Sequence, residues 1–345
     1  MVTRASVQGN QARGADWQPL VSICIPTYNR PEALARVVES MLAQTYSPIE
    51  IIVTDDGDSE KTRAALGPLL EKIRYEANEK RLGLYANWNR AIELARGELV
   101  ASYHDHDYYA PTVVERSVEL FRKSARVGIV HVATAMVWED GRRLDILYRE
   151  LPEIADGRWF AEKQAWRWPS YVYHGSIMVR RDLYETLGKF DEHIGFAADM
   201  EMLNRFCLHC DIGYIKDFLY VTQGRTPKDP FFEFKWQYVV DYIRVRKLVI
   251  ERMYAGDRMG LSLARARLTA QIDKRILREL AACKVRGQER LVREGLEVAE
   301  KEATPAARAI AKALASDALP AKAARSLAFA GYRAMRLART LASRR

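Results

Sequence analysis

The two common glycine-rich loops that bind phosphate groups are absent from this chain of 345 residues. The turn that ends the first apolar run reads Pro26-Thr27-Tyr28-Asn29-Arg30, where a dinucleotide-binding fold carries Gly-x-Gly-x-x-Gly. The Gly-Lys-Ser/Thr sequence of a P-loop is missing as well. We therefore expect any bound phosphate to be held by side chains and a metal ion, and not by a glycine backbone.

Cysteine is scarce, and long apolar runs are missing. The cysteines are Cys24, Cys207, Cys210 and Cys283, and the Cys-x-x-Cys pair at 207–210 lacks the second pair that a zinc site needs. No apolar run approaches the length of a transmembrane helix, and residues 1–19 show no signal-peptide pattern. These features predict a cytoplasmic protein in a reducing compartment.

Positive charge is concentrated at the C-terminal end of the chain. The formal net charge is +9, and residues 256–345 hold 20 of the 54 Lys and Arg residues but only 9 of the 45 Asp and Glu residues. The residues before 256 are therefore close to neutral, so no nucleic-acid partner is expected. The hydrophobic content of 48% is typical of a globular protein with a sizeable core.

Apolar strands alternate with amphipathic helices from residue 20 to residue 102. We expect strands at 20–25, 50–54, 73–76 and 98–102, and helices at 31–44, 59–70 and 84–95. This alternation predicts parallel βαβ units in a doubly wound α/β sheet, mostly parallel and flanked by helices. Right-handed crossovers then bring three polar turns to one edge of the sheet, namely 26–30, 55–59 and 103–109.

The last of these turns, Tyr103-His104-Asp105-His106-Asp107, places two carboxylates and two imidazoles directly after a buried strand. Closely spaced acids repel each other, so a cation is their natural partner. Hard divalent cations bind carboxylate oxygens and keep water or phosphate as further ligands. The functional interpretation is a site for a metal ion and a diphosphate. The alternative is a polar loop that caps the following helix.

Six segments resemble the motifs of the family 2 glycosyltransferases, which have the GT-A fold. They are residues 21–30, 51–57, 78–87, 105–111, 188–192 and 199–205. The resemblance covers about residues 20–222, and it is more specific than any one motif because the segments follow the family order. It implies a nucleotide-sugar donor, inversion at the anomeric carbon, and a GT-A sheet. From about residue 229 the sequence pattern changes to helices, which predicts a C-terminal helical region after the sheet.

The resemblance also implies which side chains bind the donor. Thr27 and Tyr28 would line the pocket for the base and ribose, and Asp55 would accept a hydrogen bond from the pyrimidine N3–H. Arg81 would approach the base or the phosphates, because a guanidinium suits phosphate oxygens. The other implied donor-binding residues are Pro26, Arg30, Asp56, Asp105 and His106. For Asp55-Asp56-Gly57 the alternative is a plain turn.

The chain departs from the family pattern at the metal site. The acid that usually binds the metal in this family falls at or beside His106, with Asp105 and Asp107 on either side. The resemblance therefore implies a site among Asp105, His106 and Asp107, and which of the three bind the ion stays open. The expected ion is Mn²⁺ or Mg²⁺; imidazole can ligate Mn²⁺ and is a poor ligand for Mg²⁺.

On the acceptor side, residues 195–206 resemble the acidic element that carries the catalytic base in this family. Asp199 is expected to take the proton of the acceptor hydroxyl, with Glu201 as the reserve candidate. His174 borders the implied acceptor pocket, and Arg205 is expected to support the acidic element or the diphosphate. For Asp199 the alternative is an acid that caps a helix or lies in its first turn.

The expected organisation begins with a flexible leader at 1–19 and a glycosyltransferase domain at 20–225. A helical extension at 226–302 and a basic amphipathic helical tail at 303–345 follow. Arginine on one face of the tail and leucine and alanine on the other are typical of an element that binds an anionic membrane surface, here the inner face of the cell membrane. The alternatives are a helix packed on the extension and a disordered basic tail.

The sequence thus predicts an inverting, metal-dependent glycosyltransferase. Its donor would be a UDP-sugar, or else a dTDP- or GDP-sugar, and its acceptor a glycan or lipid-linked glycan in cell-surface polysaccharide synthesis. Two alternatives are a catalytically degenerate binding or scaffold protein on the same fold, prompted by His106, and a nucleotidyltransferase. The glycine- and arginine-rich first loop of a nucleotidyltransferase is missing.

Overall fold

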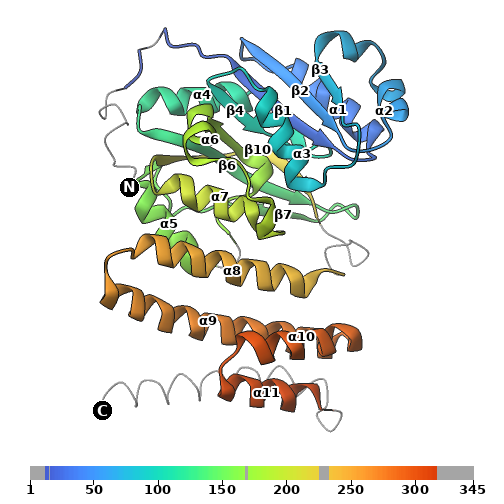
Figure 1. The fold of residues 1–345 in the computed structure, drawn as a ribbon. Helices are drawn as coiled ribbons and strands as arrows, with labels where there is room; N and C mark the ends of the chain where they lie inside the picture. The colour runs from blue at the N-terminus through green and yellow to red at the C-terminus, as the bar shows by residue number, and fades with distance from the viewer. Residues whose placement is uncertain (1–11, 15, 168–169, 225–232, 317–345) are drawn as a thin grey trace. The chain divides into compact units, whose positions relative to one another are not determined.

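The computed structural model describes residues 12–14, 16–167, 170–224 and 233–316 (Figure 1). The chain divides into two compact units, one formed by residues 1–193 and 198–227 and the other by residues 194–197 and 228–345. The described part of the first unit carries the sheet, and the described part of the second consists mainly of helices.

A ten-stranded mixed sheet forms the centre of the first unit, in the order β3-β2-β1-β4-β9-β6-β10-β5, with β7 beside β6 and β8 beside β10. Its strands are β1 (Val21–Thr27), β2 (Ile49–Asp55), β3 (Arg74–Ala77), β4 (Leu99–Ser102), β5 (Tyr108–Tyr109), β6 (Val127–Val137), β7 (Arg143–Ile146), β8 (Ile154–Ala155), β9 (Ile177–Arg180) and β10 (Asp211–Gln223). The four strands from β3 to β4 are parallel to one another, as the sequence predicts. β9 is antiparallel to both of its neighbours, β4 and β6.

Helices pack on both faces of this sheet (Figure 1). The α-helices are α1 (Pro31–Leu42), α2 (Ser59–Leu66), α3 (Leu84–Leu94), α4 (Val113–Lys123), α5 (Gly157–Trp166), α6 (Arg181–Leu187) and α7 (Ala198–Cys207), and the short 3₁₀ helices are η2 (Gly67–Lys72), η3 (His174–Ser176) and η4 (Glu192–Ile194). Apolar side chains of α1 and α4 share one core cluster with Ile23 and Ile25 of β1. On the other face, the thiol of Cys24 donates to the carbonyl of Ala91 in α3. β1 is therefore buried on both faces, which explains its nearly continuous apolar sequence.

The second unit contains α8 (Lys235–Met253), α9 (Arg258–Val285), α10 (Glu289–Glu302) and α11 (Pro305–Ala315). Thr304 caps α11, because its hydroxyl oxygen accepts a hydrogen bond from the Ala307 N–H and its hydroxyl proton goes to Asp273 of α9. α11 packs on α9 and α10 through a buried face that includes Leu314. The first turns of the predicted tail thus belong to a helical bundle.

Two predicted segments fall largely outside the described residues. The remainder of the basic tail, 317–345, lies there, and so do residues 1–11 and 15 of the predicted leader. Trp17, at the end of that leader, packs against the core of the first unit, and its carbonyl accepts a hydrogen bond from Arg122. Among the described residues, none of the helices has the length and apolar character that a bilayer span requires.

Candidate functional site

The carboxyl ends of β1, β2 and β4 lie beside one another, and a polar turn follows each of them. Thr27 is paired with Asp55 in the parallel register of β1 and β2. The hydroxyl of Thr27 donates to Asp105 Oδ2 at 2.7 Å, which joins the first turn to the turn after β4. The Asp56 N–H donates to the Thr27 carbonyl at 3.0 Å. The three turns that the sequence places on one edge therefore meet in the structure.

The turns after β1 and β2 are fitted together by Asn29 and Gly57. Asn29 has a positive φ of 52°, and its side-chain oxygen accepts a hydrogen bond from the Asp58 N–H at 3.0 Å. A Cβ atom at Gly57 would lie 2.4 Å from the same oxygen. Glycine is therefore required at position 57 by close approach, and Asn29 is one of the few residue types that adopt this backbone conformation readily.

Asp55 is buried, and both of its carboxylate oxygens accept hydrogen bonds. Oδ1 accepts from the Gly57 N–H at 2.8 Å, and Oδ2 accepts from the Tyr75 hydroxyl at 2.7 Å. Burial and this contact with Asp55 raise the pKa of Tyr75, so the phenol remains a donor. The orientation of the Asp55 carboxylate is thus set by β3 as well as by its own turn.

Asp56 holds the loop between β3 and α3. Its Oδ1 accepts hydrogen bonds from the Asn78 side chain at 2.9 Å and from the Leu82 N–H at 2.8 Å, and its Oδ2 accepts from the Gly83 N–H at 2.7 Å. Asn78 also donates to Asn87 Oδ1, and the Asn87 amide in turn donates to the carbonyls at the ends of β1 and β2. Asp56 therefore stabilises the conformation of the loop between β3 and α3.

Tyr28 and Arg81 form the exposed side of this region. The Arg81 guanidinium lies 4.3 Å from the centre of the Tyr28 ring, and the tyrosine is 45% exposed. A cation over an aromatic ring holds both groups at the surface. An open aromatic face next to a guanidinium suits a base and a phosphate, which are the two groups that the sequence assigns to these residues.

Asp105 is buried between residues of two turns. Its Oδ2 accepts from Thr27, while its Oδ1 lies 3.1 Å from Arg30 Nη1 and 2.8 Å from His106 Nδ1. Burial by itself would raise the pKa of Asp105, but the hydrogen bond with His106 and the charge of Arg30 lower it. Asp105 is therefore an ionised group that already has three partners.

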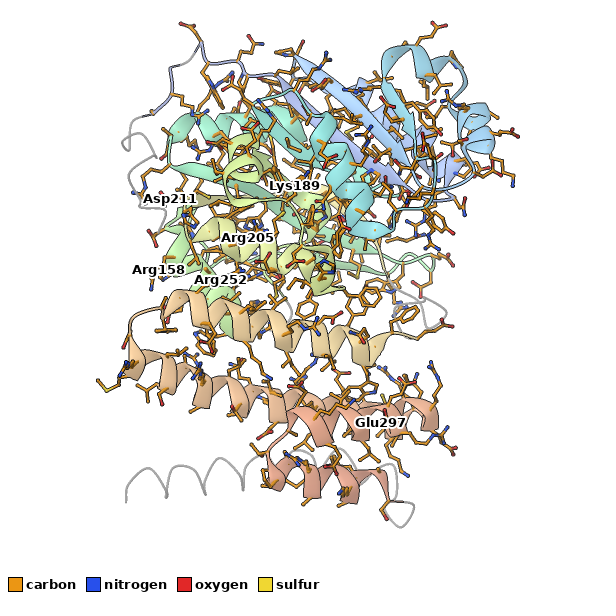
Figure 2. All side chains as sticks on the ribbon, in the orientation of Figure 1. Arg158, Lys189, Arg205, Asp211, Arg252 and Glu297 are labelled. Atoms are coloured by element: carbon orange, nitrogen blue, oxygen red, sulfur yellow. The ribbon has the colours of Figure 1, made fainter. Side chains whose placement is uncertain are left out.

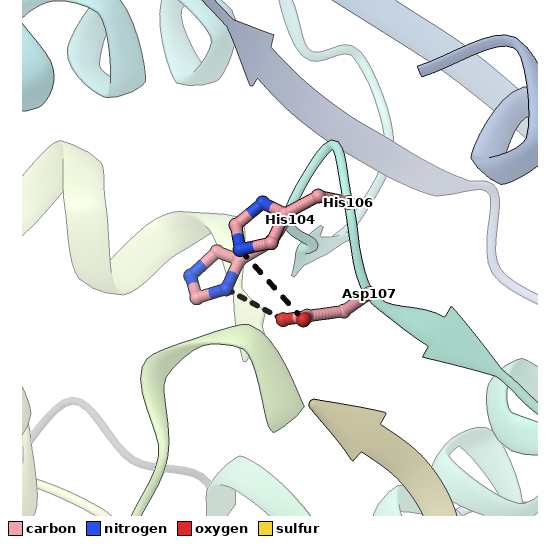
Figure 3. A group of neighbouring side chains, drawn as sticks. All are labelled: His104, His106 and Asp107. Atoms are coloured by element: carbon pink, nitrogen blue, oxygen red, sulfur yellow. Dashed lines mark hydrogen bonds and ion pairs between the residues drawn. The ribbon is translucent and has the colours of Figure 1, made fainter. Parts of the chain in front are cut away.

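Asp107 and two imidazoles form a compact cluster (Figure 3). Asp107 Oδ2 lies 2.8 Å from His104 Nδ1 and accepts a hydrogen bond from the Tyr220 hydroxyl at 2.5 Å. Asp107 Oδ1 lies 3.8 Å from His106 Nε2. Burial favours a higher pKa for Asp107, yet the hydrogen bond with His104 and the proximity of both imidazoles lower it to about 2.

This cluster fits a divalent metal ion. His104, His106 and Asp107 each offer one ligand atom, and these atoms lie within 4.8 Å of one another. Asp107 Oδ1 is buried and has no hydrogen-bond partner, although His106 Nε2 lies 3.8 Å away. Buried charges in proteins are usually paired or bound to metals.

His174 lies behind the cluster, in η3. Its ring packs against Trp88 at 4.7 Å and Phe190 at 5.2 Å, and lies 5.8 Å from the His104 ring. Burial, and then the nearby His104, lower the pKa of His174 well below its ordinary value, so the ring is neutral. A Cβ atom on the next residue, Gly175, would lie 2.8 Å from His104 Nδ1, so only glycine leaves room for that imidazole.

The predicted base and its reserve both lie on α7, in very different surroundings. Asp199 is half-buried in the first turn, and its Oδ1 accepts a hydrogen bond from the Met200 N–H. Glu201 is buried, and its oxygens accept from the Arg205 guanidinium at 3.1 to 3.2 Å. Arg205 also donates to backbone carbonyls of 187–189, the segment labelled by Lys189 in Figure 2.

Arg205 and Glu201 thus form a buried ion pair that ties α7 to the loop after α6. The described contacts join Arg205 to Glu201 and to the carbonyl of Lys189, and the two roles expected for Arg205 stay predictions. Asp199 lies two positions before Glu201 on the same helix. Neither residue is linked by any of these contacts to the His104–Asp107 cluster, so their relation to it stays a prediction.

Comparison with known proteins bears on the first unit. The sequence model of glycosyl transferase family 2 matches residues 22–188. The chain carries a glycosyl transferase family 2 domain. All three turns at the sheet edge and η3 lie within the matched residues.

Curated relatives of this family 2 domain include an uncharacterized glycosyltransferase of Nostoc sp., 36% identical over 117 residues, or 32% of this chain and 35% of the relative. An uncharacterized glycosyltransferase of Rickettsia typhi is 29% identical over 195 residues, or 55% of this chain and 59% of the relative. Chondroitin synthase of Escherichia coli is 29% identical over 196 residues, which are 53% of this chain and 26% of that protein. The chain therefore spans only about a quarter to three fifths of these relatives.

Among solved structures, a crystal structure of S. aureus TarS is similar with a TM-score of 0.51 and 16% identity, over 91% of this chain and 89% of that chain. A second TarS structure has a TM-score of 0.51 and 15% identity, over 91% of this chain and 54% of that chain. At this level of identity the likeness concerns the fold. The predicted GT-A fold with C-terminal helices is confirmed.

Sequence reasoning missed several residues that shape the site. His104 stands in the expected turn, yet only its position beside Asp107 gives it a part in the cluster. Tyr220 and Gly175 come from β10 and from η3, far along the chain, and no local pattern marks them. Asn87 could have been recognised from the sequence, because it is the last residue of the motif 78–87.

Proposed function

We propose that this protein is an inverting glycosyltransferase that moves a sugar from a nucleotide-sugar donor, with UDP as the leading nucleotide and dTDP or GDP as alternatives. The observation that carries this proposal is the meeting of Thr27, Asp55 and Asp105 at one sheet edge, beside a His–Asp cluster that fits a metal ion. The proposed acceptor is a glycan or a lipid-linked glycan in polysaccharide synthesis.

In this proposal the base of the donor lies against the turns after β1 and β2. The Asp55 carboxylate would accept the N3–H of a pyrimidine, since each of its oxygens keeps a lone pair besides the one used by Gly57 or Tyr75. The exposed Tyr28 ring and the Arg81 guanidinium would contact the base and phosphate, respectively. Arg30 holds Asp105 and adds positive charge beside the phosphates.

A divalent ion held by the cluster would bind diphosphate oxygens and offset the charge that develops on the departing nucleoside diphosphate. Both imidazoles are about one-third exposed, with side-chain values of 30% and 31%, whereas the Asp107 side chain is fully buried. A ligand that approaches from solvent would therefore contact the imidazoles first, and the Asp107 carboxylate would contact it from the buried side.

The transfer step needs a base on the acceptor side. The acceptor hydroxyl oxygen forms the new bond to the anomeric carbon while the bond from that carbon to the diphosphate breaks. The hydroxyl proton passes to the Asp199 carboxylate, and the nucleoside diphosphate leaves with the electron pair. Asp199 is preferred over Glu201 because the Glu201 carboxylate is already engaged by Arg205.

The test is a screen of UDP-, dTDP- and GDP-sugars with Mn²⁺, in which release of free nucleoside diphosphate is measured with and without glycan acceptors. We expect release from one donor class, and loss of acceptor-dependent release in Asp199→Asn. Binding of a nucleotide-sugar with no turnover under any condition would favour the scaffold alternative. Release of pyrophosphate from a nucleoside triphosphate and a sugar phosphate would favour a nucleotidyltransferase.

We also propose that the basic residues 304–345 bring the protein to an anionic membrane surface, where a lipid-linked acceptor resides. The support is the composition of this segment, in which positive charge is combined with leucine and alanine. Co-sedimentation with anionic vesicles is expected for the full chain and reduced for a chain that ends at Ser316, which keeps α11. Equal sedimentation of both chains would contradict the proposal.

A further inference from the structure

We propose that Asp241 of α8 is a positioning residue for the proposed sugar transfer, and that it acts by fixing the backbone of residues 195–196, where the chain enters α7 and approaches Asp199. The proposal deepens the proposed function and rests on it, since Asp199 is the base only if the protein transfers a sugar. It gives a residue of the second unit a part in the transfer step.

The chain leaves the first unit for four residues just before α7. Residues 194–197 are grouped with the helices of the second unit, and Ala198, the next residue, is the first of α7. Phe196 precedes Asp199 by three positions. Because so few bonds separate the two residues, a displacement of the backbone at 195–196 is passed on directly to the start of α7.

Asp241 holds this backbone by a hydrogen bond. Its side chain is buried, and each of its carboxylate oxygens accepts one bond. Oδ2 accepts from the Phe196 N–H at 2.9 Å, and Oδ1 accepts from the Gln237 side chain at 2.7 Å. Gln237 lies one turn before Asp241 on α8 and orients its carboxylate. A bond from a backbone N–H to a carboxylate is stronger than one between neutral groups, so the segment is firmly attached to α8.

Gly195 allows the chain to pass close to this carboxylate. Its φ is 80°, in the region that favours glycine, and a Cβ atom there would lie 2.4 Å from Asp241 Oδ2 and 2.8 Å from Asp241 Cγ. A side chain at this position would strain the backbone and displace the carboxylate from the Phe196 N–H. Gly195→Ala is therefore a second way to disturb the attachment, and it leaves the carboxylate in the protein.

The ring of Phe196 is held by the same helix. It stacks on the Tyr238 ring, with centres 4.2 Å apart and an interplanar angle of 12°. Tyr238 lies three positions before Asp241, so the two residues share one face of α8. α8 thus holds Phe196 both by its ring and by its N–H, and this fixes the direction of the chain as well as its position.

The transfer step depends on such an attachment because a base must lie within hydrogen-bond reach of the acceptor hydroxyl. A misplacement of about 1 Å can cost about a hundredfold in rate. Asp199 is half-buried in the first turn of α7, directly after the attached segment. Loss of the Asp241 carboxylate should therefore misplace or loosen the base and leave the turns proposed to bind the donor intact.

The experiment compares Asp241→Ala with Asp241→Asn in the full chain. Asparagine keeps a side-chain oxygen for the Phe196 N–H, and Gln237 can turn its own amide oxygen toward the new NH₂ group; alanine offers no acceptor. Acceptor-dependent release of nucleoside diphosphate, donor hydrolysis without acceptor, and donor affinity are measured. We expect Asp241→Ala to lower kcat of transfer by about tenfold or more, with hydrolysis and donor affinity unchanged. Gly195→Ala should lower kcat as well, and Asp241→Asn should retain most of it.

Asp273→Ala is the matched control. Asp273 is also a buried carboxylate of the second unit, and it also accepts a hydrogen bond from a backbone N–H, that of Thr304. Both alanine variants should lower the Tm, but only Asp241→Ala should lower kcat. A kcat of transfer in folded Asp241→Ala equal to that of Asp273→Ala would reduce Asp241 to a structural residue and overturn the proposal.

Amide hydrogen exchange at residues 196–200 tests the attachment without any substrate. Exchange there should accelerate in Asp241→Ala, and not in Asp241→Asn or Asp273→Ala. Unchanged exchange in Asp241→Ala would overturn the proposal even in a protein that transfers sugar. Accelerated exchange in a protein that turns over no nucleotide-sugar would instead refute the proposed function and leave the hold of Asp241 on the start of α7 established.

Discussion

The hydroxyl of Thr27 and the carboxylate of Asp105 are joined by a hydrogen bond of 2.7 Å, although 78 positions of sequence separate them. Thr27 is the last residue of β1 and Asp105 follows β4, and these neighbouring parallel strands are in register from Val21 and Leu99 onward. A bond between the two turns therefore requires only that the strands pair correctly. It makes the orientation of Asp105, and through it that of His106, depend on a residue of the first turn.

Replacement of Thr27 by valine tests this dependence. Thr27→Val keeps the side-chain shape and removes the only hydroxyl that donates to Asp105 Oδ2 among the described contacts. Hydrogen bonds to charged groups contribute about 1.5 to 3 kcal/mol, so the free energy of unfolding should fall by that amount. Urea denaturation measures the change, and Thr134→Val, at a buried threonine of β6, is the control. A loss no larger than that of the control would contradict the assignment.

Asp56 is predicted to act through the loop it holds. In Asp56→Ala the N–H groups of Leu82 and Gly83 lose their acceptor, so their amide hydrogen exchange should accelerate and donor binding should weaken. Asp58→Ala serves as the matched control, because it removes the N-cap of α2 and an exposed ion pair with Lys61, leaves the 78–83 loop untouched and should cost about 1 kcal/mol. Unchanged exchange at both amides in Asp56→Ala would show that the loop keeps its conformation without the carboxylate.

Replacement of Asp199 is predicted to lower turnover, and replacement of Glu201 is predicted to lower stability. Asp199→Asn removes the proton acceptor, so turnover should fall by about a hundredfold while thermal stability and donor binding persist. Glu201→Gln instead leaves the Arg205 guanidinium without its ionic partner and should cost about 3 kcal/mol in the free energy of unfolding. Turnover assays and thermal denaturation of both variants separate these effects. If Asp199→Asn turns over normally, the role of the base moves to Glu201 or to His174.

His131 should make the stability of the protein fall at acid pH. The ring is buried beside Tyr214, and burial lowers its pKa from 6.5 to about 3 in the folded state. Below pH 6.5 His131 binds a proton in the unfolded chain, whereas in the folded protein it stays neutral down to about pH 3. The free energy of unfolding therefore falls as the pH is lowered across that window. The slope from this one group is about 1.4 kcal/mol per pH unit.

His131→Phe keeps a flat ring at this position and has no group to titrate. Between pH 7 and pH 5 the wild type should therefore lose about 2 kcal/mol more of its unfolding free energy than the variant. Urea denaturation at both pH values supplies the measurement. Parallel losses in the two proteins would mean that His131 protonates equally in both states.

The parallel part of the sheet and the position of the site could be predicted from the sequence. Each of the strands β1, β2 and β4 is a short apolar run that ends in Thr, Asp or Ser, and hydrophobic periodicity marks the helices between them. Strand direction alone then places Thr27, Asp55 and Asp105 on one edge. The motifs that carry the family resemblance contain these same residues, so the strand pattern and the resemblance predict the same site.

The antiparallel part could not be predicted in the same way. β9 enters between β4 and β6 from a position more than seventy residues after β4, and no local rule sets that pairing. The contacts of His104 with Gly175 and Tyr220 depend on this long-range topology. The Glu201–Arg205 pair has a spacing of four residues on α7, which is common on exposed helices, and only the structure reveals that the pair is buried.

The order of strands also has a consequence for the newly made chain. Ribosomes deliver the N-terminal residues first, and domains fold in that direction. Once β1, β2, β4 and the turn after β4 have emerged, Thr27 can already reach Asp105, and the turns after β1 and β2 can form. Tyr220, which donates a hydrogen bond to Asp107 from 113 positions later, has not yet been translated at that moment. A nascent chain can therefore join the turns after β1, β2 and β4 well before β10 supplies the hydrogen-bond partner of Asp107.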